Sequence, residues 1–589
     1  MSGHFRHAMP YGAQLQDDGR TRFRLWAPDA DQVELVFEES THAMSALDDG
    51  WHECVRQAPP GTRYRYRIRP ELCVPDPASR LQQDGDVHGA SVVVDPAAYP
   101  WQHADWRGRP WHEAVLYELH VGACGGFRGV QATLPRLQAL GITAIELMPI
   151  AQFPGRRNWG YDGVLPFAPA AADGTPDELK ALIDAAHGLG LMVILDVVYN
   201  HFGPDGNYLG EYAAAFFRSE GPGTPWGAAI DVALPQVGDF FVHNALYWLE
   251  EYRFDGLRLD AVHALHDPAW LLSLAARVRA AMSGRQVHLI LENEANQAHL
   301  LGSGRFDAQW NDDFHNALHV LLTGESAGYY GAYADDPMGK LVRCLGEGFA
   351  WQGEPMRGKP RGEPSGDLSP LCFIHFLQNH DQIGNRALGE RLTSLCEPAV
   401  LEAACALLLL APPVPMLFMG EEWGSRTPFL YFTDHQTEAL RDAVREGRRK
   451  EFAEFESYGQ AETLPDPNAA STFERSRLDP HDAASPEGLA RLTLVRQLLA
   501  QRQRHLAPHL QHAQAMGAFA LGKRALHASW RLGGAVLCIY CNLGDTPAAI
   551  DVTPTAGTQW LHGNPAAIAA FRAGRLPPAC TLVFLEPSA

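Results

Sequence analysis

The sequence contains no hydrophobic run long enough to cross a membrane. Its first twelve residues, MSGHFRHAMPYG, lack the apolar segment that a secretory signal requires. The longest apolar run, near residues 404–415, is interrupted by Pro412, Pro413 and Pro415 and is shorter than the roughly 20 residues that span a bilayer. We therefore expect a cytoplasmic protein with no membrane partner.

Positive charge is also scarce. Lysine and arginine number 48 against 69 aspartates and glutamates, which gives a formal net charge of −21. A chain of this charge has no bulk attraction for phosphate backbones or anionic lipid. Nucleic acid is therefore not expected as a partner, and a neutral or cationic ligand is favoured.

The ten cysteines form no spacing pattern typical of a disulfide framework or a metal site. Cys538-Ile-Tyr-Cys541 has neither a second Cys-x-x-Cys nor a nearby histidine pair. A strand at this place would direct its two thiols to opposite faces. We expect reduced cysteines, no bound metal and no cofactor.

The chain is long and contains many aromatic residues. Its 589 residues suffice for several domains, or for one large barrel with additions. Fourteen tryptophans, 17 tyrosines and 26 phenylalanines supply flat apolar faces for sugar rings, although most aromatic side chains of any protein belong to its core. This composition permits a carbohydrate enzyme without indicating one.

Alternating residues predict a small β-domain at each end of the chain. Tyr64-Arg-Tyr-Arg-Ile68 places aromatic side chains on one face and arginines on the other, which favours a β-sandwich over residues 1–105. Alternation returns at residues 535–540 and 581–585, which predicts a C-terminal β-domain over residues 511–589. Helical patterns at residues 438–457 and 488–504 precede it.

Eight short apolar runs occupy the region between these domains, at residues 114–120, 144–148, 191–196, 256–260, 287–292, 306–310, 372–377 and 414–419. Amphipathic segments at 177–187 and 240–252 fit helices between such strands. Alternating strands and helices in this number predict a closed parallel (β/α)8 TIM barrel, an α/β fold, over residues 106–510. An open doubly wound sheet is the alternative, but no glycine-rich phosphate fingerprint follows the first strand.

The carboxyl ends of the predicted strands carry polar side chains. The third run leads into Asp196-Val-Val-Tyr-Asn-His201, the fourth into Arg258-Leu-Asp260, the fifth into Glu292-Asn-Glu294 and the seventh into Gln378-Asn-His-Asp381. Reacting groups of TIM barrels gather at this rim, so three or more carboxylates are expected to converge there. A single such aspartate is more often a helix cap or an ion-pair partner, but four successive polar ends favour an active site.

Side-chain alternation gives two of these carboxyls different predicted surroundings. Arg258 and Asp260 share one face of their strand, so the arginine is expected to keep Asp260 ionised. Glu292 ends an apolar run, where desolvation is expected to raise its pKa. Glu294 has the same strand parity but lies further into the loop, so we expect Glu292 to be the acid. One ionised and one protonated carboxyl are what glycoside hydrolysis needs.

Histidines and aromatic residues near the rim complete the predicted site. His201 and His380 belong to no metal-ligand spacing, so we expect them to hydrogen-bond substrate hydroxyls. Tyr161, in the turn Asn158-Trp-Gly-Tyr-Asp162, offers an aromatic face at the rim. Weaker candidates of the same kind are Trp310, Trp423 and Phe429.

At these positions the sequence resembles the α-amylase family of glycoside hydrolases, which are retaining barrel enzymes acting on α-glucans. Residues 196–201, 256–263, 291–293 and 378–381 look like its four shared motifs, in order. The resemblance implies that Asp260 is the nucleophile and Glu292 the general acid/base. It also implies that Asp381 grips substrate hydroxyls and stabilises the transition state.

Longer stretches resemble one group within that family. Residues 148–164, 379–391 and 416–424 are similar to those of members that release trehalose from maltooligosyltrehalose by cutting the α-1,4 bond next to its trehalose end. The resemblance implies α-glucan oligosaccharides as substrates. It also implies a substrate-binding set of Tyr161, Asp162, His201, Arg258, His263, Trp310, Asn379, His380, Glu421 and Trp423.

Two other functions stay open. A glycogen branching or debranching enzyme of the same family would use the same three carboxylates on another acceptor or bond. The N-terminal segment of this chain also resembles the sandwich that precedes the barrel in those enzymes, so it does not discriminate between the functions. A catalytically inactive glucan-binding protein is expected to have lost a carboxylate or Arg258, and this sequence keeps them. The first βα loop, at residues 123–127, is shorter than in the relatives, which is expected to alter a subsite but not the chemistry.

Overall fold

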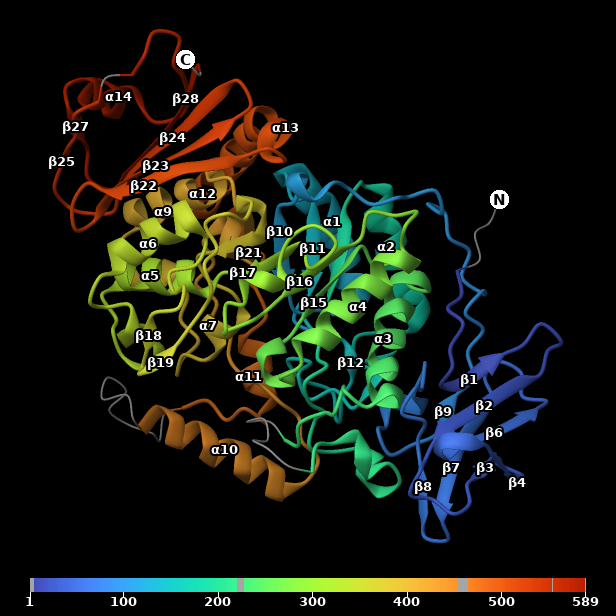
Figure 1. The fold of residues 1–589 in the computed structure, drawn as a ribbon. Helices are drawn as coiled ribbons and strands as arrows, with labels where there is room; N and C mark the ends of the chain where they lie inside the picture. Colours follow the sequence, from blue (N-terminus) through green and yellow to red (C-terminus); the bar gives the residue numbers. More distant parts are fainter. Residues whose placement is uncertain (1–4, 220–226, 454–463, 553, 588–589) are drawn as a thin grey trace.

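The computed structural model describes residues 5–219, 227–453, 464–552 and 554–587. These residues form a barrel flanked by two β-rich parts (Figure 1). The N-terminal strands, drawn in blue, lie on one side of the barrel and the C-terminal sheet, drawn in red, lies on another. Among the described residues, no helix combines the length and the apolar character needed to cross a membrane.

Eight parallel strands close into the barrel that the sequence predicts, which rules out the open doubly wound sheet. Each strand pairs with the next, and β10 also pairs with β21, so no sheet edge remains in the barrel. All eight are buried along their length, as parallel strands covered by helices must be. The strands are β10 (Leu116–Leu119), β11 (Ala144–Leu147), β14 (Met192–Val197), β15 (Gly256–Leu259), β16 (His288–Leu291), β17 (Ala308–Trp310), β20 (Phe373–Phe376) and β21 (Val414–Phe418).

Helices connect these strands, and two of them match the predicted amphipathic segments, α2 and α3. The start of α2 is a capping box: Thr175 Oγ1 accepts from the Glu178 amide at 3.2 Å, and the Glu178 carboxylate accepts from the Thr175 amide at 3.0 Å. Such a cap stabilises a helix by about 1 kcal/mol. The connecting helices include α1 (Gly126–Leu140), α2 (Pro176–Gly188), α3 (Pro235–Glu250), α4 (Pro268–Ala281), α5 (Asp312–Thr323), α6 (Pro337–Glu347) and α9 (Pro398–Leu410).

The N-terminal strands form two antiparallel sheets, as predicted for a β-sandwich. Their orders are β1-β2-β6-β5 and β4-β3-β7-β8, with β9 paired to β7. Tyr64 and Tyr66 are buried while the alternating arginines of β7 are more exposed. Tyr11 joins this part to α3 by donating its hydroxyl to the Gln236 carbonyl at 2.6 Å. The strands are β1 (Gly12–Leu15), β2 (Thr21–Trp26), β3 (Glu34–Val36), β4 (Thr41–Ala43), β5 (Ser45–Ala46), β6 (Trp51–Arg56), β7 (Arg63–Arg69), β8 (Leu72–Val74) and β9 (Ser91–Val92).

A five-stranded antiparallel sheet forms the C-terminal part, again as predicted. Its order is β22-β23-β24-β28-β26, and α14 (Pro565–Arg572) packs on it through Phe571. All ten cysteines of the chain are unpaired, including Cys538 and Cys541 of β24. The strands are β22 (Gln514–Ala520), β23 (Ala525–Leu532), β24 (Ala535–Asn542), β26 (Gln559–His562) and β28 (Cys580–Pro587).

Two further helices correspond to the helical patterns predicted after the barrel. The pattern at residues 438–457 is α10 (Glu438–Ala453), and its last part, 454–457, lies outside the described residues. The pattern at 488–504 is α12 (Pro486–Gln501), which continues as a short π-helical turn. Val444 and Gly447 of α10 reach the cavity described next.

Candidate active site

A cavity of about 790 Å³ opens at the carboxyl ends of the barrel strands. Its volume falls within the range of about 300–1,000 Å³ found for small-molecule sites. The structure brings together polar residues that follow four different barrel strands, as the sequence predicts. The predicted residues that line the cavity are Tyr161, Asp162, His201, Arg258, Asp260, His263, Glu292, His380 and Asp381.

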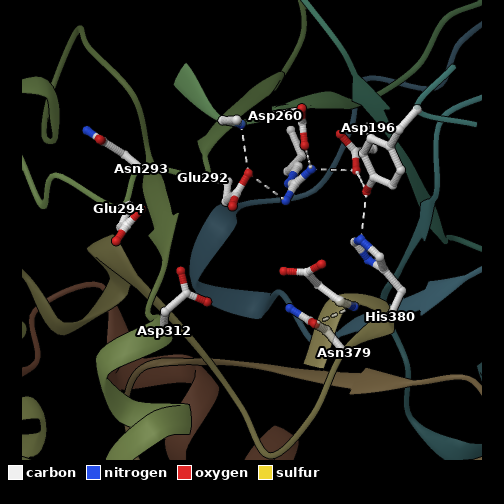
Figure 2. Close-up of polar contacts among 12 residues, drawn as sticks. Asp196, Asp260, Glu292, Asn293, Glu294, Asp312, Asn379 and His380 are labelled. Atoms are coloured by element: carbon white, nitrogen blue, oxygen red, sulfur yellow. Dashed lines mark hydrogen bonds and ion pairs between the residues drawn. The ribbon is translucent and has the colours of Figure 1, made fainter. Parts of the chain in front are cut away.

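Arg258 is the centre of the polar contacts in this cavity (Figure 2). Its Nη1 donates to Asp196 Oδ2 at 2.6 Å and to Asp260 Oδ1 at 3.1 Å. Its Nη2 lies 3.2 Å from Glu292 Oε2. The guanidinium also stacks on Trp310, with 3.9 Å from its carbon to the ring centroid. One cation thus holds three carboxyl groups, one within β14 and one directly after each of the adjacent strands β15 and β16.

Asp260 follows β15 directly and shares the orientation of Arg258, as strand parity predicts. Its Oδ2 accepts a hydrogen bond from Asn200 Nδ2 at 2.8 Å, and the same amide donates to the Asp260 carbonyl at 2.9 Å. The side chain is 11% exposed. A carboxylate held at both oxygens and open to the cavity is suited to attack on a bound sugar.

The surroundings of Glu292 differ from the apolar setting that the sequence predicts. Its Oε2 accepts a 2.7 Å hydrogen bond from the Ala261 amide, in addition to its contact with Arg258. Ala261 has a φ of 41°, uncommon for a residue with a Cβ, and this turn brings its amide to the end of the neighbouring strand. Glu294 is 62% exposed and lies apart from these contacts (Figure 2), which supports Glu292 as the acid.

Asp381 enters the cavity from the first turn of the short helix α7 (His380–Gly384). Asn379 caps this helix, because its Oδ1 accepts from the amides of Asp381 at 2.9 Å and of Gln382 at 3.2 Å. Asn385 holds the carboxyl from the next turn by donating to Asp381 Oδ1 at 2.5 Å. Burial raises the pKa of Asp381 above its ordinary value. The helix therefore fixes a third carboxyl in the cavity.

A chain of contacts through Glu118, His380, Tyr161 and Asp196 runs along one side of the cavity, and we call it the histidine wall. Glu118 Oε1 lies 2.5 Å from His380 Nδ1, and His380 Nε2 lies 2.9 Å from Tyr161 Oη. Tyr161 donates its hydroxyl to Asp196 Oδ2 at 2.7 Å, so His380 Nε2 is the donor toward Tyr161. Although burial lowers it, the Glu118 carboxylate raises the pKa of His380 above its usual value. His380 is therefore held as an imidazolium.

The position of Tyr161 depends on a tight turn. Gly160 has a φ of +106°, and a Cβ at this residue would lie 1.9 Å from the Pro149 carbonyl oxygen, so the turn requires glycine. His201 supports the same turn, with Nε2 3.0 Å from the Tyr161 carbonyl and Nδ1 2.6 Å from Asn200 Oδ1. Burial lowers the pKa of His201. His201 thus connects the turn to the Asn200 amide that orients Asp260.

The other side of the cavity in Figure 2 is formed around helix α5, and we call it the α5 wall. Figure 2 shows the Asp312 carboxyl directed into the cavity from the start of this helix. The wall also includes Glu294 from the loop after β16, which Figure 2 places on the same side. Its cavity-lining residues are Glu294, Asp312, Asn316, Tyr329, Tyr333 and Arg361.

Four predicted substrate-binding residues do not line the cavity: Trp310, Asn379, Glu421 and Trp423. Trp310 is 2% exposed beneath the Arg258 guanidinium, and Asn379 acts as the cap of α7. Glu421 is buried and accepts from the last amide of β21 at 3.1 Å. Trp423 packs against the Arg136 guanidinium at 4.9 Å. These residues support the elements that carry the cavity.

Glu118 and Asp312 contribute to the cavity or its wall without a prediction from the sequence. Glu118 lies within β10 rather than after it, where every residue is buried and the pattern gives no sign of an inward carboxyl. Asp312 follows β17, so the rule that polar residues follow barrel strands finds it once it is extended to the sixth strand. Among the described residues, no group of three or more His, Cys, Asp or Glu side chains is placed to hold a metal ion.

Known protein families match all three parts of the chain. Residues 10–96 match carbohydrate-binding module 48, the isoamylase N-terminal domain. Residues 83–219 match the alpha amylase catalytic domain, and residues 513–584 match a domain of unknown function, DUF3459. These matches coincide with the N-terminal sheets, with the first three strands of the barrel and with the C-terminal sheet.

Curated relatives are similar over most of the chain. The malto-oligosyltrehalose trehalohydrolase of Deinococcus radiodurans is 41% identical over 491 residues, which cover 82% of this chain and 81% of the relative. That of Saccharolobus solfataricus is 40% identical over 492 residues, which cover 80% of this chain and 83% of the relative. An alpha-amylase-type protein of Salmonella typhimurium has a TM-score of 0.91 at 42% identity and covers 98% of this chain and 99% of its own.

Proposed function

The chain belongs to the malto-oligosyltrehalose trehalohydrolases of the α-amylase family, and on this premise we propose which bond it cleaves and which residues cleave it. It is a glycoside hydrolase of trehalose formation. We infer that it hydrolyses the α-1,4-glucosidic bond next to the trehalose end of maltooligosyltrehalose and releases trehalose and a malto-oligosaccharide. The observation that carries the proposal is the shared contact of Asp260 and Glu292 with Arg258 at the ends of adjacent strands.

In the first step, Asp260 is the nucleophile. Its carboxylate attacks the anomeric carbon of the last glucose residue before trehalose, while Glu292 gives a proton to the glycosidic oxygen. The bond between that carbon and that oxygen breaks, trehalose departs, and a glycosyl ester forms on Asp260. Arg258 and Asn200 support this step because they hold the carboxylate in place before the substrate reacts.

In the second step, Glu292 acts as the base. Its carboxylate takes a proton from a water molecule, which attacks the anomeric carbon and releases Asp260. Because each step inverts the configuration at this carbon, the malto-oligosaccharide is released with the α configuration. Tyr161 and His380 of the histidine wall, together with Asp381, are proposed to bind the hydroxyl groups of the reacting glucose residue, since all three line the cavity with Asp260.

Two observations favour this function over the alternatives. A branching or debranching enzyme would share the three carboxylates, but the relatives at 40–41% identity bear the trehalohydrolase name. An inactive glucan-binding protein has no need for the nucleophile, the acid and their arginine together, and here all three are joined by contacts of 3.2 Å or less.

Product analysis tests the proposal directly. The purified protein is incubated with maltotriosyltrehalose and, in parallel, with maltopentaose, which has the same number of glucose units and no trehalose end. We expect trehalose and maltotriose from the first and little product from the second. Transfer of glucan chains, or cleavage of an α-1,6 branch in a branched dextrin, would instead assign the alternative function.

The anomeric form of the first product tests the roles of the two carboxyls. Proton NMR of freshly released maltotriose is expected to show the α-anomer before mutarotation. A β-anomer appearing first would reject Asp260 as the nucleophile, although it would leave the cleaved bond unchanged.

A further inference from the structure

Asp312 is a carboxyl group of the cavity that the proposed reaction does not use. It is the first residue of α5 and lines the cavity. Its Oδ1 accepts a long hydrogen bond, 3.4 Å, from Gln382 Nε2. Arg361, the cation whose charge acts on Asp312, makes its ion pair with the neighbouring Asp313 at 3.3 Å. Arg361 is therefore paired with Asp313 and not with Asp312.

The two aspartates at the start of α5 have different environments. The Asp313 side chain is fully buried, and its carboxyl also accepts from Asn296 Nδ2 at 2.9 Å and from Tyr333 Oη at 2.6 Å. Asp312 is half-buried and faces the cavity instead. Buried polar groups in proteins find hydrogen-bond partners, so a group that has only a weak one within the protein is available to a ligand.

The order of the barrel strands indicates which part of the substrate reaches Asp312. Asp260, Glu292 and Asp312 follow β15, β16 and β17, which are consecutive around the barrel. Asp260 reacts at the anomeric carbon and Glu292 at the glycosidic oxygen, so the leaving group lies beyond Glu292 in this direction. Figure 2 shows Asp312 and Glu294 on that side, away from the histidine wall.

We propose that Asp312 binds a hydroxyl group of the departing trehalose and thereby selects the leaving group, an inference that rests on the proposed function. Burial and the nearby carboxylates of Glu292 and Asp381 raise the pKa of Asp312 well above its usual range. A sugar hydroxyl can both donate to and accept from a carboxyl group. Asp312 therefore offers a sugar on the leaving side a carboxyl oxygen that the protein itself fills only weakly.

Two substrates with the same maltotriosyl group separate a leaving-group contact from other roles. Maltotriosyltrehalose loses trehalose, whereas α-maltotriosyl fluoride loses fluoride and places no sugar beyond Glu292. For Asp312→Ala we expect kcat/KM to fall about 10- to 100-fold on the first substrate and less than about 2-fold on the second. Asp312→Asn keeps a donor and an acceptor and is expected to stay within about 3-fold of the wild type on both.

A matched control and a second readout accompany these variants. Asp335→Ala removes an aspartate whose side chain is 78% exposed and which does not line the cavity, and it is expected to leave both rates unchanged. With the fluoride as donor, added trehalose competes with water for the glycosyl enzyme. We expect Asp312→Ala to form about 10-fold less maltotriosyltrehalose than the wild type at an unchanged rate of fluoride release.

The outcomes distinguish this proposal from the proposed function. Equal losses on both substrates, or no loss on either, would overturn the role of Asp312 in binding the leaving group. A shifted pH profile with the fluoride would also overturn it, because Asp312 would then act through Glu292. If the wild-type protein releases no trehalose from maltotriosyltrehalose, the proposed function fails and this inference fails with it.

Discussion

On the histidine wall, Glu118, His380, Tyr161 and Asp196 are joined by contacts of 2.5 to 2.9 Å, whereas on the α5 wall the Asp312 carboxyl accepts a hydrogen bond of 3.4 Å. The groups of the histidine wall are already joined to one another by short hydrogen bonds before a ligand binds. Such preorganised groups stabilise a transition state without having to reorient. The second wall keeps hydrogen-bonding capacity, and unsatisfied groups of this kind discriminate between partners that fill them and partners that do not.

The comparison indicates a division of work between the two walls. If the proposed roles are correct, the histidine wall fixes the geometry at the anomeric carbon. The α5 wall would then select the leaving group through polar groups that only the correct sugar satisfies. Asp260, Glu292 and Arg258 lie where the two walls meet, so substitutions there and on each wall have different expected effects on substrates with and without a leaving sugar.

Loss of Asp260, the proposed nucleophile, is expected to affect the substrates with and without a leaving sugar equally. For Asp260→Asn we expect kcat/KM to fall at least about 1,000-fold with maltotriosyltrehalose and with α-maltotriosyl fluoride alike, because neither can form the glycosyl ester. Initial rates with both substrates, and circular dichroism to verify the fold, provide the measurement. A variant that keeps more than about a tenth of the wild-type rate would point to another nucleophile.

Loss of the acid sharpens the comparison, because only a sugar leaving group needs its proton. For Glu292→Gln we expect a loss of about 1,000-fold in kcat/KM with maltotriosyltrehalose but no more than about 10-fold with the fluoride. Azide is expected to raise the turnover of the fluoride by attacking the glycosyl enzyme without a base.

Glu294→Gln is the matched control for this variant. Glu294 has the same strand parity, but its side chain is 62% exposed on the α5 wall, so we expect its rate with the fluoride, which has no leaving sugar, to stay within about 3-fold of the wild type. If Glu294→Gln shows azide rescue and Glu292→Gln stays active, the acid is Glu294, two residues further along the chain than we infer.

A substitution at Glu118, a member of the histidine wall that does not line the cavity, tests the role of the wall without removing a substrate contact. For Glu118→Gln we expect kcat/KM to fall about 10-fold on both substrates, because His380 loses the carboxylate that keeps it protonated. Since that carboxylate raises the pKa of His380, its removal lowers it, and the alkaline fall in activity is expected to begin at a lower pH. A loss confined to maltotriosyltrehalose, with an unchanged pH profile, would contradict the comparison.

Glu146 gives the smallest expected effect, on stability rather than on rate. It pairs with Glu118 in the barrel register, and within the described part of the chain neither of its carboxyl oxygens has a hydrogen-bond partner. Burial, with a smaller effect of Glu118, raises the pKa of Glu146 well above its ordinary value of 4.5. The folded state therefore keeps this proton, and the stability that it contributes declines as the pH rises above about 4.5.

Glu146→Gln removes this titration while keeping the shape of the side chain. Its thermal midpoint, measured at a fixed scan rate, is expected to match the wild type near pH 4.5 and to exceed it by about 1–3 °C near pH 8. Activity on both substrates is expected to stay within about 2-fold of the wild type. A midpoint difference that does not grow with pH would show that Glu146 is not the titrating group.

The barrel strands could be predicted from the sequence because strands buried on both faces must be continuous apolar runs, and all eight runs became barrel strands. The positions of Asp260, Glu292 and Asp381 in the cavity could be predicted because the parallel strands of a barrel end at one rim. The surroundings of Glu292 could not, since Ala261 and Arg258 reach it from the neighbouring strand and a linear sequence does not give that register.

Trp310 and the pair Asp312 and Asp313 show the limits of the rule that polar or aromatic residues after barrel strands line the site. Trp310 is the last residue of β17 and not the first of its loop, so it is buried against Arg258 rather than exposed at the rim. Asp312 and Asp313 are neighbours of the same type, and only the point at which α5 begins decides which one faces the cavity. A shift of one residue in a predicted boundary exchanges their roles.

Pairing of β10 with β21 joins Leu116 to Met416, about 300 residues later in the chain. A ribosome adds roughly 5–20 residues per second, so one edge of β10 waits on the order of 15–60 seconds for its partner to be synthesised. During this time the growing chain has an open strand edge, which is a template for aggregation. The N-terminal sheets are made within residues 12–92 and are complete before this wait begins. Correct folding during synthesis therefore depends on keeping the incomplete barrel from pairing with other chains until β21 is synthesised.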